Sequence, residues 1–393
     1  MGDEQTLSAE EQLRLSHEQF EAGQDFTLSI EEEFALLDPD THDMVNRFEE
    51  IEAAVRGTEL QKDFAGELIA SEVEIKTGRC ETFAEAADKL AERRGQLIEV
   101  VDRLGIALGG TGTHPWSSWK DQRIIDTPHY RRNDELLRYV TWRNNTFGLH
   151  VHIGIRGADR AVAVCSALRS YLPDLLAVSA SSPFIENCVT HLHSARSQTF
   201  TKMFPRCGIP DPFASWAEYE GFLRYLYATG SMTEHTQLWW SIRLHLAFPT
   251  VEVRICDAQP ELAEARALAA LIYALTARVA RAVDEGEQLA IHPDRLIEEN
   301  FWRAIRYGLT GELLDLNRMD ELRVRPARVA AEELVEWVLP VAEELGLSRE
   351  LEIPRANAAE RQLAASEAGA TLAEIYAQQV TRTHDAAFEA AHG

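Results

Sequence analysis

The chain has 393 residues and carries 64 acidic against 39 basic side chains, which gives a formal net charge of −25 and a pI near 4.9. This charge argues against general binding to nucleic acid or to an anionic membrane, because both partners require a positive surface. With 45% hydrophobic and 26% charged residues, the composition is that of a globular protein long enough to bury a large core.

Cysteine usage and the lack of targeting signals bear on the compartment. Five cysteines stand at positions 80, 165, 188, 207 and 256, without a CxxC pair. The odd number favours reduced thiols in a cytoplasmic protein. No N-terminal run fits a signal peptide, and no stretch reaches the ~20 apolar residues of a membrane span. We therefore expect a cytoplasmic protein without a membrane partner.

The N-terminal part of the chain predicts short elements ahead of one long helix. Residues 1–24 are polar and acidic, and we interpret them as a leader, either a short helix or a frayed segment. Residues 48–55 are predicted to be helical. Residues 82–104 have an apolar stripe of helical period, and Thr82 with Glu85 three positions later is typical of a capped helix start.

The rest of the chain adds a strand and several longer helices. Residues 106–110 predict a buried strand that leads into a tight glycine-rich loop. Residues 159–179 and 261–284 predict long apolar helices, and from about residue 293 the pattern is amphipathic helix. Without strict strand–helix alternation, the order predicts an α+β fold in which helices pack against one face of an antiparallel or mixed sheet. We expect a single catalytic domain over residues 25–393.

Four short segments alternate an apolar face with a face of reactive polar residues. Successive side chains of a strand point to opposite sides, so residues two apart reach one surface. A sheet with one face on helices and the other lining a cleft accounts for this pattern, which indicates an enzyme. The polar pairs are Glu31 and Glu33, His150 and His152, Arg243 and His245, and Glu252 and Arg254.

The first two of these carboxylates predict a cation site. Glu31 and Glu33 would share one strand face, where like charges repel unless a divalent cation neutralises them. A solvated acidic patch is the alternative. Glu32 falls on the apolar face by parity, and the sequence offers no partner for it.

A second acidic segment follows at residues 67–78. Glu72, Glu74 and Lys76 share a face of a regular strand, and a surface Glu–Lys pair is one interpretation of them. Glu67 has the opposite parity, so it joins Glu74 only if a bulge or turn intervenes.

The remaining polar pairs point to phosphate chemistry. His150 and His152 lie near glycines that permit close approach. Carboxylates with Arg243 and Arg254 suit Mg²⁺ or Mn²⁺ holding phosphates, whose charge guanidinium groups neutralise. The sequence lacks an HExxH motif, a Walker A loop and a GxGxxG motif, so metal and arginine would hold any nucleotide.

Taken together, seven strings resemble the second family of glutamate–cysteine ligases, the carboxylate–amine ligases related to glutamine synthetase. The likeness runs in order from about residue 25 to 310. The strings are Ile30–Phe34, Val73–Gly78, Gly112–Trp116, Phe147–Gly154, Ser179–Phe184, Thr250–Pro260 and Asn300–Gly308.

The resemblance implies a glutamine-synthetase-like fold, in which the concave face of a curved, mainly antiparallel sheet is the active site and helices cover the outside. It implies Mg²⁺ (or Mn²⁺) as cofactor and ATP as co-substrate. It also implies a role for each matched residue. The metal ligands would be Glu31, Glu33, Glu67, Glu74, His150 and Glu252, the catalytic residues Glu33, Arg243 and Arg254, and the substrate-binding residues Arg196, His152, Thr113 and His114.

The implied reaction activates a carboxylate, typically the γ-carboxyl of glutamate, as an acyl phosphate that an amine then attacks. Residues 190–196 and 203–208 depart from the commoner pattern of these ligases, so the amine acceptor stays open between cysteine and another amine. A homo-oligomer also stays open. Two alternatives remain, a metal-dependent amidase that uses the same face without ATP, and a non-catalytic binding protein that has kept the fold.

Overall fold

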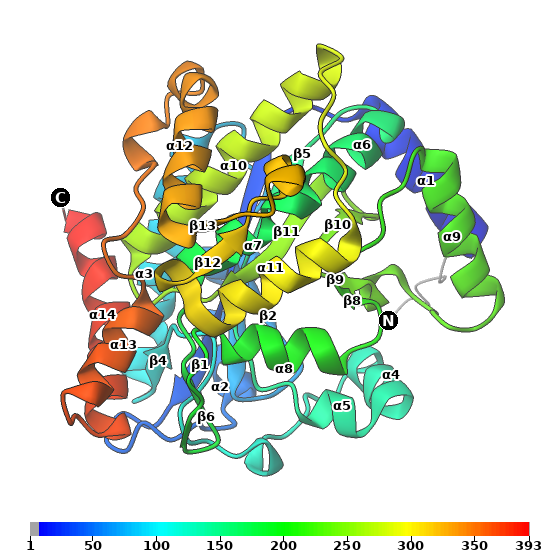
Figure 1. Cartoon of the computed structure of the whole chain (residues 1–393). Coiled ribbons are helices and arrows are strands. Elements are labelled where there is room, and N and C mark those ends of the chain that lie inside the picture. The colour runs from blue at the N-terminus through cyan, green and yellow to red at the C-terminus, as the bar shows by residue number, and fades with distance from the viewer. Residues whose placement is uncertain (1–7, 393) are drawn as a thin grey trace.

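The computed structural model describes residues 8–392 and shows helices packed around an antiparallel sheet whose strands differ in length (Figure 1). Within these residues the largest sheet has seven strands in the order β10-β11-β5-β1-β3-β2, with β4 beside β1, and every pairing in it is antiparallel. The predicted α+β class is confirmed. The strands are β1 Leu28–Leu37, β2 Phe64–Gly66, β3 Glu72–Lys76, β4 Ala107–Gly109, β5 Gly148–Gly154, β10 Ile242–His245 and β11 Thr250–Asp257.

Three small two-stranded sheets and a set of helices complete the described part. The small sheets pair β6 Phe184–Ile185 with β7 Cys188–Val189, β8 Cys207–Gly208 with β9 Trp239–Trp240, and β12 Glu312–Leu314 with β13 Val324–Pro326. The α-helices are α1 Ala9–Ala22, α2 Phe48–Val55, α3 Phe83–Arg103, α4 Pro128–Leu137, α5 Tyr139–Trp142, α6 Ala158–Leu168, α7 Leu172–Ser179, α8 Ala195–Met203, α9 Trp216–Ala228, α10 Leu262–Asp284, α11 Asp294–Tyr307, α12 Ala327–Glu344, α13 Ala358–Glu367 and α14 Leu372–His392.

One face of the large sheet is apolar and forms the core. Ile30 on β1, Val151 on β5 and Val253 on β11 are at most 1% exposed and belong to one cluster. Helices α6, α7 and α10 pack against strands β10, β11 and β5, while α3 packs against β1 and β3. Burial of this face supplies the main stabilising term. The polar side chains of the same strands are left on the opposite face.

The predicted helix starts agree well with the structure. Helix α2 covers the predicted residues, and α3 begins after Thr82, whose hydroxyl accepts a hydrogen bond from the Glu85 backbone N–H. The Glu85 carboxylate reaches back to the N–H of Glu81, one residue earlier than a capping box requires.

The apolar stretch predicted as one helix over residues 159–179 is two helices. α6 and α7 are separated by a 3₁₀ turn at Arg169–Tyr171. Arg169 is 1% exposed and donates to the Pro210 carbonyl, which accounts for a charged residue inside an apolar segment. Among the described residues, the stretch Ala158–Ser179 is long and apolar enough to cross a membrane by length and composition alone, and 83% of its most apolar part is buried inside the protein.

The described part of the N-terminal segment is a helix packed on the domain. Ser8 and Glu11 form a capping box at the start of α1. Leu13 and Phe20 are fully buried, and α1 packs against α6 and α9. This helix therefore adds to the core of the chain.

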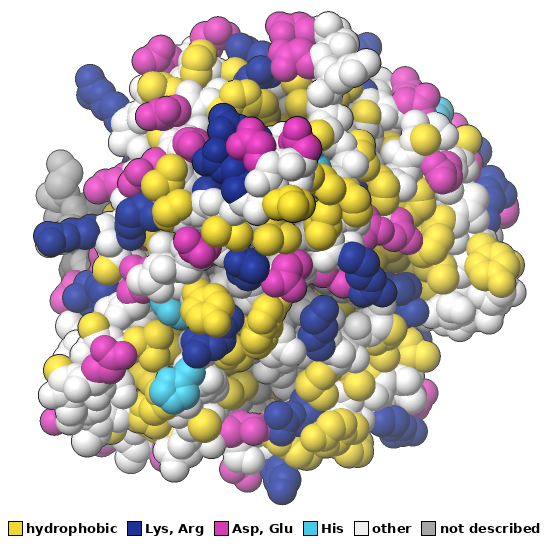
Figure 2. Space-filling view, viewed as in Figure 1, with side chains coloured by type: hydrophobic (Ala, Val, Ile, Leu, Met, Phe, Trp, Pro, Cys, Tyr) yellow, Lys and Arg dark blue, Asp and Glu magenta, His cyan; other side chains and the backbone are white. Residues whose placement is uncertain are grey.

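Acidic and basic side chains are interspersed over the face seen in Figure 2. Many of them are paired along exposed helix faces, as Arg303 is with Glu299 on α11 and Arg14 with Glu18 on α1. Such exposed pairs add little to stability because water screens them.

Glu32, which the sequence left without a partner, is paired inside the core. Its carboxylate accepts two hydrogen bonds from Arg94 on α3, at 2.6 and 3.1 Å, and neither residue is more than 2% exposed. Arg94 also donates to the carbonyls of Gln259 and Pro260. The guanidinium thus joins β1, α3 and the chain that enters α10, and it satisfies a carboxylate that would otherwise be buried alone.

We expect Arg94→Met to lower the free energy of unfolding by about 3–5 kcal/mol, because it leaves the Glu32 carboxylate buried without a partner. Urea unfolding followed by circular dichroism measures the change. The double variant Glu32→Gln/Arg94→Met should lose less than the single variant. Arg14→Met, at an exposed pair, is the control and should change stability by no more than about 0.5 kcal/mol. Equal losses for Arg94→Met and the control would contradict the role of the pair.

Candidate active site

The polar face of the sheet brings together reactive side chains from neighbouring strands. Glu31 on β1 lies opposite His150 on β5, and Glu33 lies opposite Glu74 on β3. Glu252 on β11 is flanked by His152 on β5 and Arg243 on β10. The antiparallel register alone therefore gathers residues that are more than 200 positions apart in the sequence.

Three groups on this face have ligand atoms within 4.8 Å of one another. Glu67 enters one of them from the turn between β2 and β3, which is the turn that its parity required. Hard oxygen ligands with an added imidazole suit Mg²⁺ or Mn²⁺. The groups are Glu31, Glu74 and His150; Glu31, His152 and Glu252; and Glu33, Glu67 and Glu74.

The geometry of His152 fits a bound cation. Its Nε2 is buried and has no hydrogen-bond partner within residues 8–392. The same atom lies 3.5 Å from a Glu31 oxygen and 3.7 Å from a Glu252 oxygen. These separations are too long for hydrogen bonds but suit three ligands arranged around one ion.

Crowding of the carboxylates shifts their protonation. Burial, reinforced by Glu33, raises the pKa of Glu67 to about 7. Burial and the Glu31 charge likewise raise the pKa of Glu74 well above its usual value, although Lys76 lies 2.6 Å from it. Burial would also raise the pKa of Glu31, but His152, His150 and Lys76 hold it well below the usual value. Part of the group therefore holds protons near neutral pH.

Two arginines grip Glu252. The Arg243 guanidinium donates to both carboxylate oxygens, at 2.6 and 3.2 Å, and to the Leu238 carbonyl. Arg254 pairs with the same carboxylate and lies 3.5 Å from the His150 ring. Burial would raise the pKa of Glu252, but the two guanidinium groups hold it well below its usual value. Most N–H donors of Arg243 are thus bonded to Glu252 and to backbone carbonyls. Arg254, in contrast, lines the cavity next to this pair.

Arg196 reaches the site through a β-bulge. The register between β11 and β5 shifts between Val253 and Cys256. The Arg196 guanidinium donates to the carbonyls of Ile255 and Arg254 in this bulge, at 3.2 and 3.3 Å. A Cβ on Gly148 would overlap the guanidinium, so glycine is required there for Arg196 to lie against the sheet.

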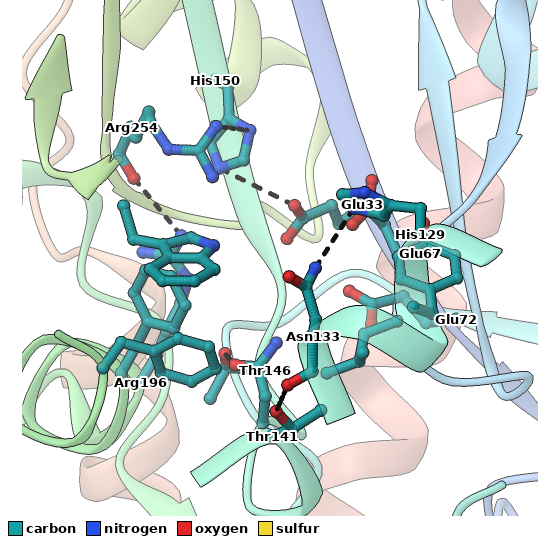
Figure 3. Close-up of a pocket in the computed structure, with 16 residues that line it drawn as sticks. Glu33, Glu67, Glu72, His129, Asn133, Thr141, Thr146, His150, Arg196 and Arg254 are labelled. Carbon is teal, nitrogen blue, oxygen red and sulfur yellow. Dashed lines mark hydrogen bonds and ion pairs between the residues drawn. The ribbon is translucent and has the colours of Figure 1, made fainter. Parts of the chain in front are cut away.

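These residues border a cavity between the sheet and the segments that cover it (Figure 3). Glu33, Glu67 and Glu72 lie on one side of it, and Arg196 and Arg254 on another. Helix α8 and strand β9 supply an aromatic wall of Phe200, Phe204 and Trp239, and the α4–α5 segment and the loop after it supply His129, Tyr130, Asn133, Thr141, Asn144 and Thr146.

The α4–α5 segment is tied across the cavity by polar contacts. His129 lies 3.1 Å from Glu234, and Arg132 lies 3.4 Å from it. The segment buries few of its own side chains. This cover has no signal in the sequence, because the segment is polar and has no apolar period. Glu72 was not among the predicted site residues, although it shares a strand face with Glu74.

Thr113 and His114 do not line this cavity. The Thr113 hydroxyl donates to the Phe184 carbonyl at 2.6 Å, and the His114 ring bonds the His42 carbonyl at 2.8 Å. His114 is fully buried against Tyr376, and burial lowers its pKa to about 4. Both side chains thus hold a loop beside the sheet, while the other predicted site residues gather on its polar face.

Comparison with known proteins matches residues 27–385 to glutamate–cysteine ligase family 2. The chain belongs to this family. A protein of Solibacter usitatus with the provisional name glutamate–cysteine ligase 2 is 38% identical over 343 residues, which cover 86% of this chain and 88% of that protein. A Sorangium cellulosum protein with the same provisional name is 39% identical over 345 residues, which cover 86% of this chain and 91% of that protein. The family resemblance inferred from the sequence is confirmed.

Two solved structures share the fold. Glutamate–cysteine ligase from Francisella tularensis, solved in complex with AMP, matches with a TM-score of 0.64 at 11% identity and covers 92% of this chain and 90% of its own. A bifunctional glutathione synthetase from Pasteurella multocida matches with a TM-score of 0.63 at 15% identity. The match covers 97% of this chain and 54% of the synthetase chain. Family membership makes this chain a carbon–nitrogen ligase of the glutamate–cysteine ligase type.

Removing one crowded carboxylate should stabilise the metal-free protein, with a dependence on pH. Because the folded-state pKa of Glu67 is raised from 4.5 to about 7, the folded protein binds its proton more tightly than the unfolded chain does. The resulting stability is present below pH 4.5 and is lost as the pH rises through 7.

In EDTA we therefore expect Glu67→Gln to raise the melting temperature by about 2 °C or more at pH 8 and to change it little at pH 4.5. Differential scanning calorimetry measures both. Mg²⁺ at pH 8 should stabilise the wild type more than the variant. Glu81→Gln, an exposed carboxylate, is the control. If Glu67→Gln raised the melting temperature by the same amount at pH 8 and at pH 4.5, the result would contradict the raised pKa of Glu67.

Proposed function

We propose that this family member is an ATP-dependent ligase that joins the γ-carboxyl of glutamate to an amine through an acyl-phosphate intermediate. The observation that carries the proposal is the juxtaposition, on one sheet face, of three carboxylate-containing ligand groups with Arg254 and Arg196. A structural neighbour was solved in complex with AMP, which supports a nucleotide as co-substrate. Cysteine or another amine is the acceptor.

In this proposal the metal ligands are the six residues that the resemblance implies, together with His152. The resemblance implies substrate binding for His152, but its unpartnered Nε2 and its place beside Glu31 and Glu252 favour a ligand role. The six are Glu31, Glu33, Glu67, Glu74, His150 and Glu252. Bound Mg²⁺ or Mn²⁺ would neutralise these carboxylates and the phosphate oxygens. We assign Arg254 to the transferring phosphoryl group, because its Nε has no hydrogen-bond partner among the described residues and the side chain lines the cavity. We assign Arg243 to positioning Glu252, on the basis of its two hydrogen bonds to that carboxylate.

The protein's own residues would carry out the remaining work. Arg196 would bind and orient the carboxylate substrate, using donors that its two backbone contacts leave free. The α4–α5 cover and the aromatic wall would exclude water from the acyl phosphate, which hydrolysis would otherwise destroy. ADP and phosphate leave once the amide has formed.

A metal-dependent amidase on the same face is the second candidate. It requires a metal-bound water as nucleophile but has no use for several arginines beside the ligand groups. The two functions differ in a simple assay. The ligase releases ADP only when glutamate and an amine are present together with Mg²⁺ and ATP, whereas the amidase hydrolyses amides without ATP.

We expect Glu33→Gln to reduce glutamate-dependent ADP release at saturating Mg²⁺ at least 100-fold, since the variant removes one ligand charge beside the phosphates. Its melting temperature in EDTA should not fall, because repulsion among the carboxylates is relieved. Coupled-enzyme detection of ADP and calorimetry measure the two effects. Near-normal turnover would contradict the role of Glu33 as a metal ligand. Glu81→Gln, at an exposed carboxylate outside the site, is the matched control and should keep wild-type turnover.

Arg196→Lys should raise the KM for glutamate about tenfold or more and leave the KM for ATP nearly unchanged. The reason is that lysine cannot form the paired hydrogen bonds of a guanidinium with a carboxylate. A charged hydrogen bond of about 1.5–3 kcal/mol accounts for this factor. Steady-state kinetics with each substrate varied in turn tests it. Equal losses for both substrates would assign Arg196 to the phosphates or to the fold.

A further inference from the structure

Glu72 is a buried carboxylate that belongs to none of the three ligand groups. It is 2% exposed, it lines the cavity, and its Oε2 has no hydrogen-bond partner within the described range 8–392. A buried carboxylate oxygen without a partner is costly, so proteins pair such groups with cations or donors. No donor of the described residues meets this oxygen, so the position suits a positive group of a bound molecule.

None of the described basic residues near the cavity donates a hydrogen bond to the Oε2 of Glu72. Lys76 lies 2.6 Å from Glu74 and 3.4 Å from Glu31. Arg254 pairs with Glu252. Arg196 donates to two backbone carbonyls and lies 3.8 Å from the buried Asp257 carboxylate, which leaves its Nε without a partner among the described residues. A cationic group of a bound molecule can therefore meet Glu72.

The strand register places Glu72 at the cavity end of the ligand groups, next to Glu33 and Glu67. Lys76 lies opposite Glu31, Glu74 opposite Glu33, and Glu72 opposite Ala35. Each step of two residues along β3 therefore leads away from the histidine-containing groups and toward the cavity. Glu72 lies one step beyond the last ligand pair, so its position suits an organic ligand in the cavity.

A positive group in the cavity wall complements Glu72. Arg196 is 5% exposed, and its Nε has no hydrogen-bond partner in the described part of the chain. It lies over Gly148, whose N–H donates to Glu33. The cavity therefore presents a carboxylate and a guanidinium, each with an unused polar atom. A zwitterion, with an ammonium and a carboxylate on one carbon, matches this pair of charges.

We propose that Glu72 binds the α-ammonium group of the amino-acid substrate whose α-carboxylate Arg196 binds, so that Glu72 determines the preference for an α-amino acid over a plain dicarboxylate. This inference rests on the proposed function and adds to it a specificity-determining residue. The γ-carboxyl of the same substrate then points toward Glu33 and the ligand groups, where phosphorylation takes place.

Glutarate tests the proposal, because it is L-glutamate without the α-ammonium group. For the wild type, kcat/KM should be much higher with L-glutamate than with glutarate. In Glu72→Gln, kcat/KM for L-glutamate should fall at least tenfold while that for glutarate stays unchanged or rises. The Mg²⁺ concentration for half-maximal rate should not change. Asp174→Asn, which alters another buried carboxylate with an unpartnered oxygen, is the control and should keep the wild-type preference.

Two results would overturn the proposal. An undiminished preference for L-glutamate in Glu72→Gln would show that the ammonium binds elsewhere. Equal losses with both substrates, together with a raised Mg²⁺ requirement, would make Glu72 a metal ligand. Glu72→Met is the second variant if the first does not fold. If the wild type releases no ADP with L-glutamate, the proposed function fails, and calorimetric titration of each variant with L-glutamate and with glutarate still decides the role of Glu72.

Discussion

Repulsion among carboxylates on one face of the sheet is the constraint on which the rest of the structure depends. Antiparallel pairing sets Glu33 opposite Glu74, and the turn after β2 adds Glu67 to the same group. Such a group is unfavourable in a buried site unless positive charge enters it. The apolar face of the same strands, packed on α6, α7 and α10, offsets that cost. Stability and chemistry are therefore assigned to opposite faces of one sheet.

The sequence was sufficient to predict what depends on local periodicity. An alternation of period two places side chains on opposite faces of any strand, so the polar pairs at Glu31 and Glu33 and at His150 and His152 followed directly. The cap at Thr82 is equally local, because it depends on residues one turn apart. The family resemblance supplied Arg196, which has no periodic signal and lies near the start of α8.

What the sequence did not predict depends on contacts between distant segments. Arg94 lies 62 positions from Glu32, so only the packing of α3 on the sheet reveals the pair. The break between α6 and α7 is different, because it has a local signal: Pro173 stands in the first turn of α7 and has no N–H to donate to the Arg169 carbonyl. The bonds of Arg169 with Pro210 and Asp294 are the non-local part of this turn. The unpartnered state of Glu72 is likewise a property of the assembled cavity. The role of Thr113 in holding a loop requires the position of Phe184, 71 residues away.

The β-bulge in β11 has a consequence for how substrate preference can change. Arg196 is anchored by main-chain carbonyls of Arg254 and Ile255, so its anchor does not depend on which side chains those two positions carry. Two residues of the aromatic wall, Phe204 and Trp239, lie outside α8, the helix that carries Arg196. Replacing these two residues can reshape the cavity while Arg196 keeps its main-chain anchor. Gly148 has no such freedom, because any side chain there would displace the guanidinium.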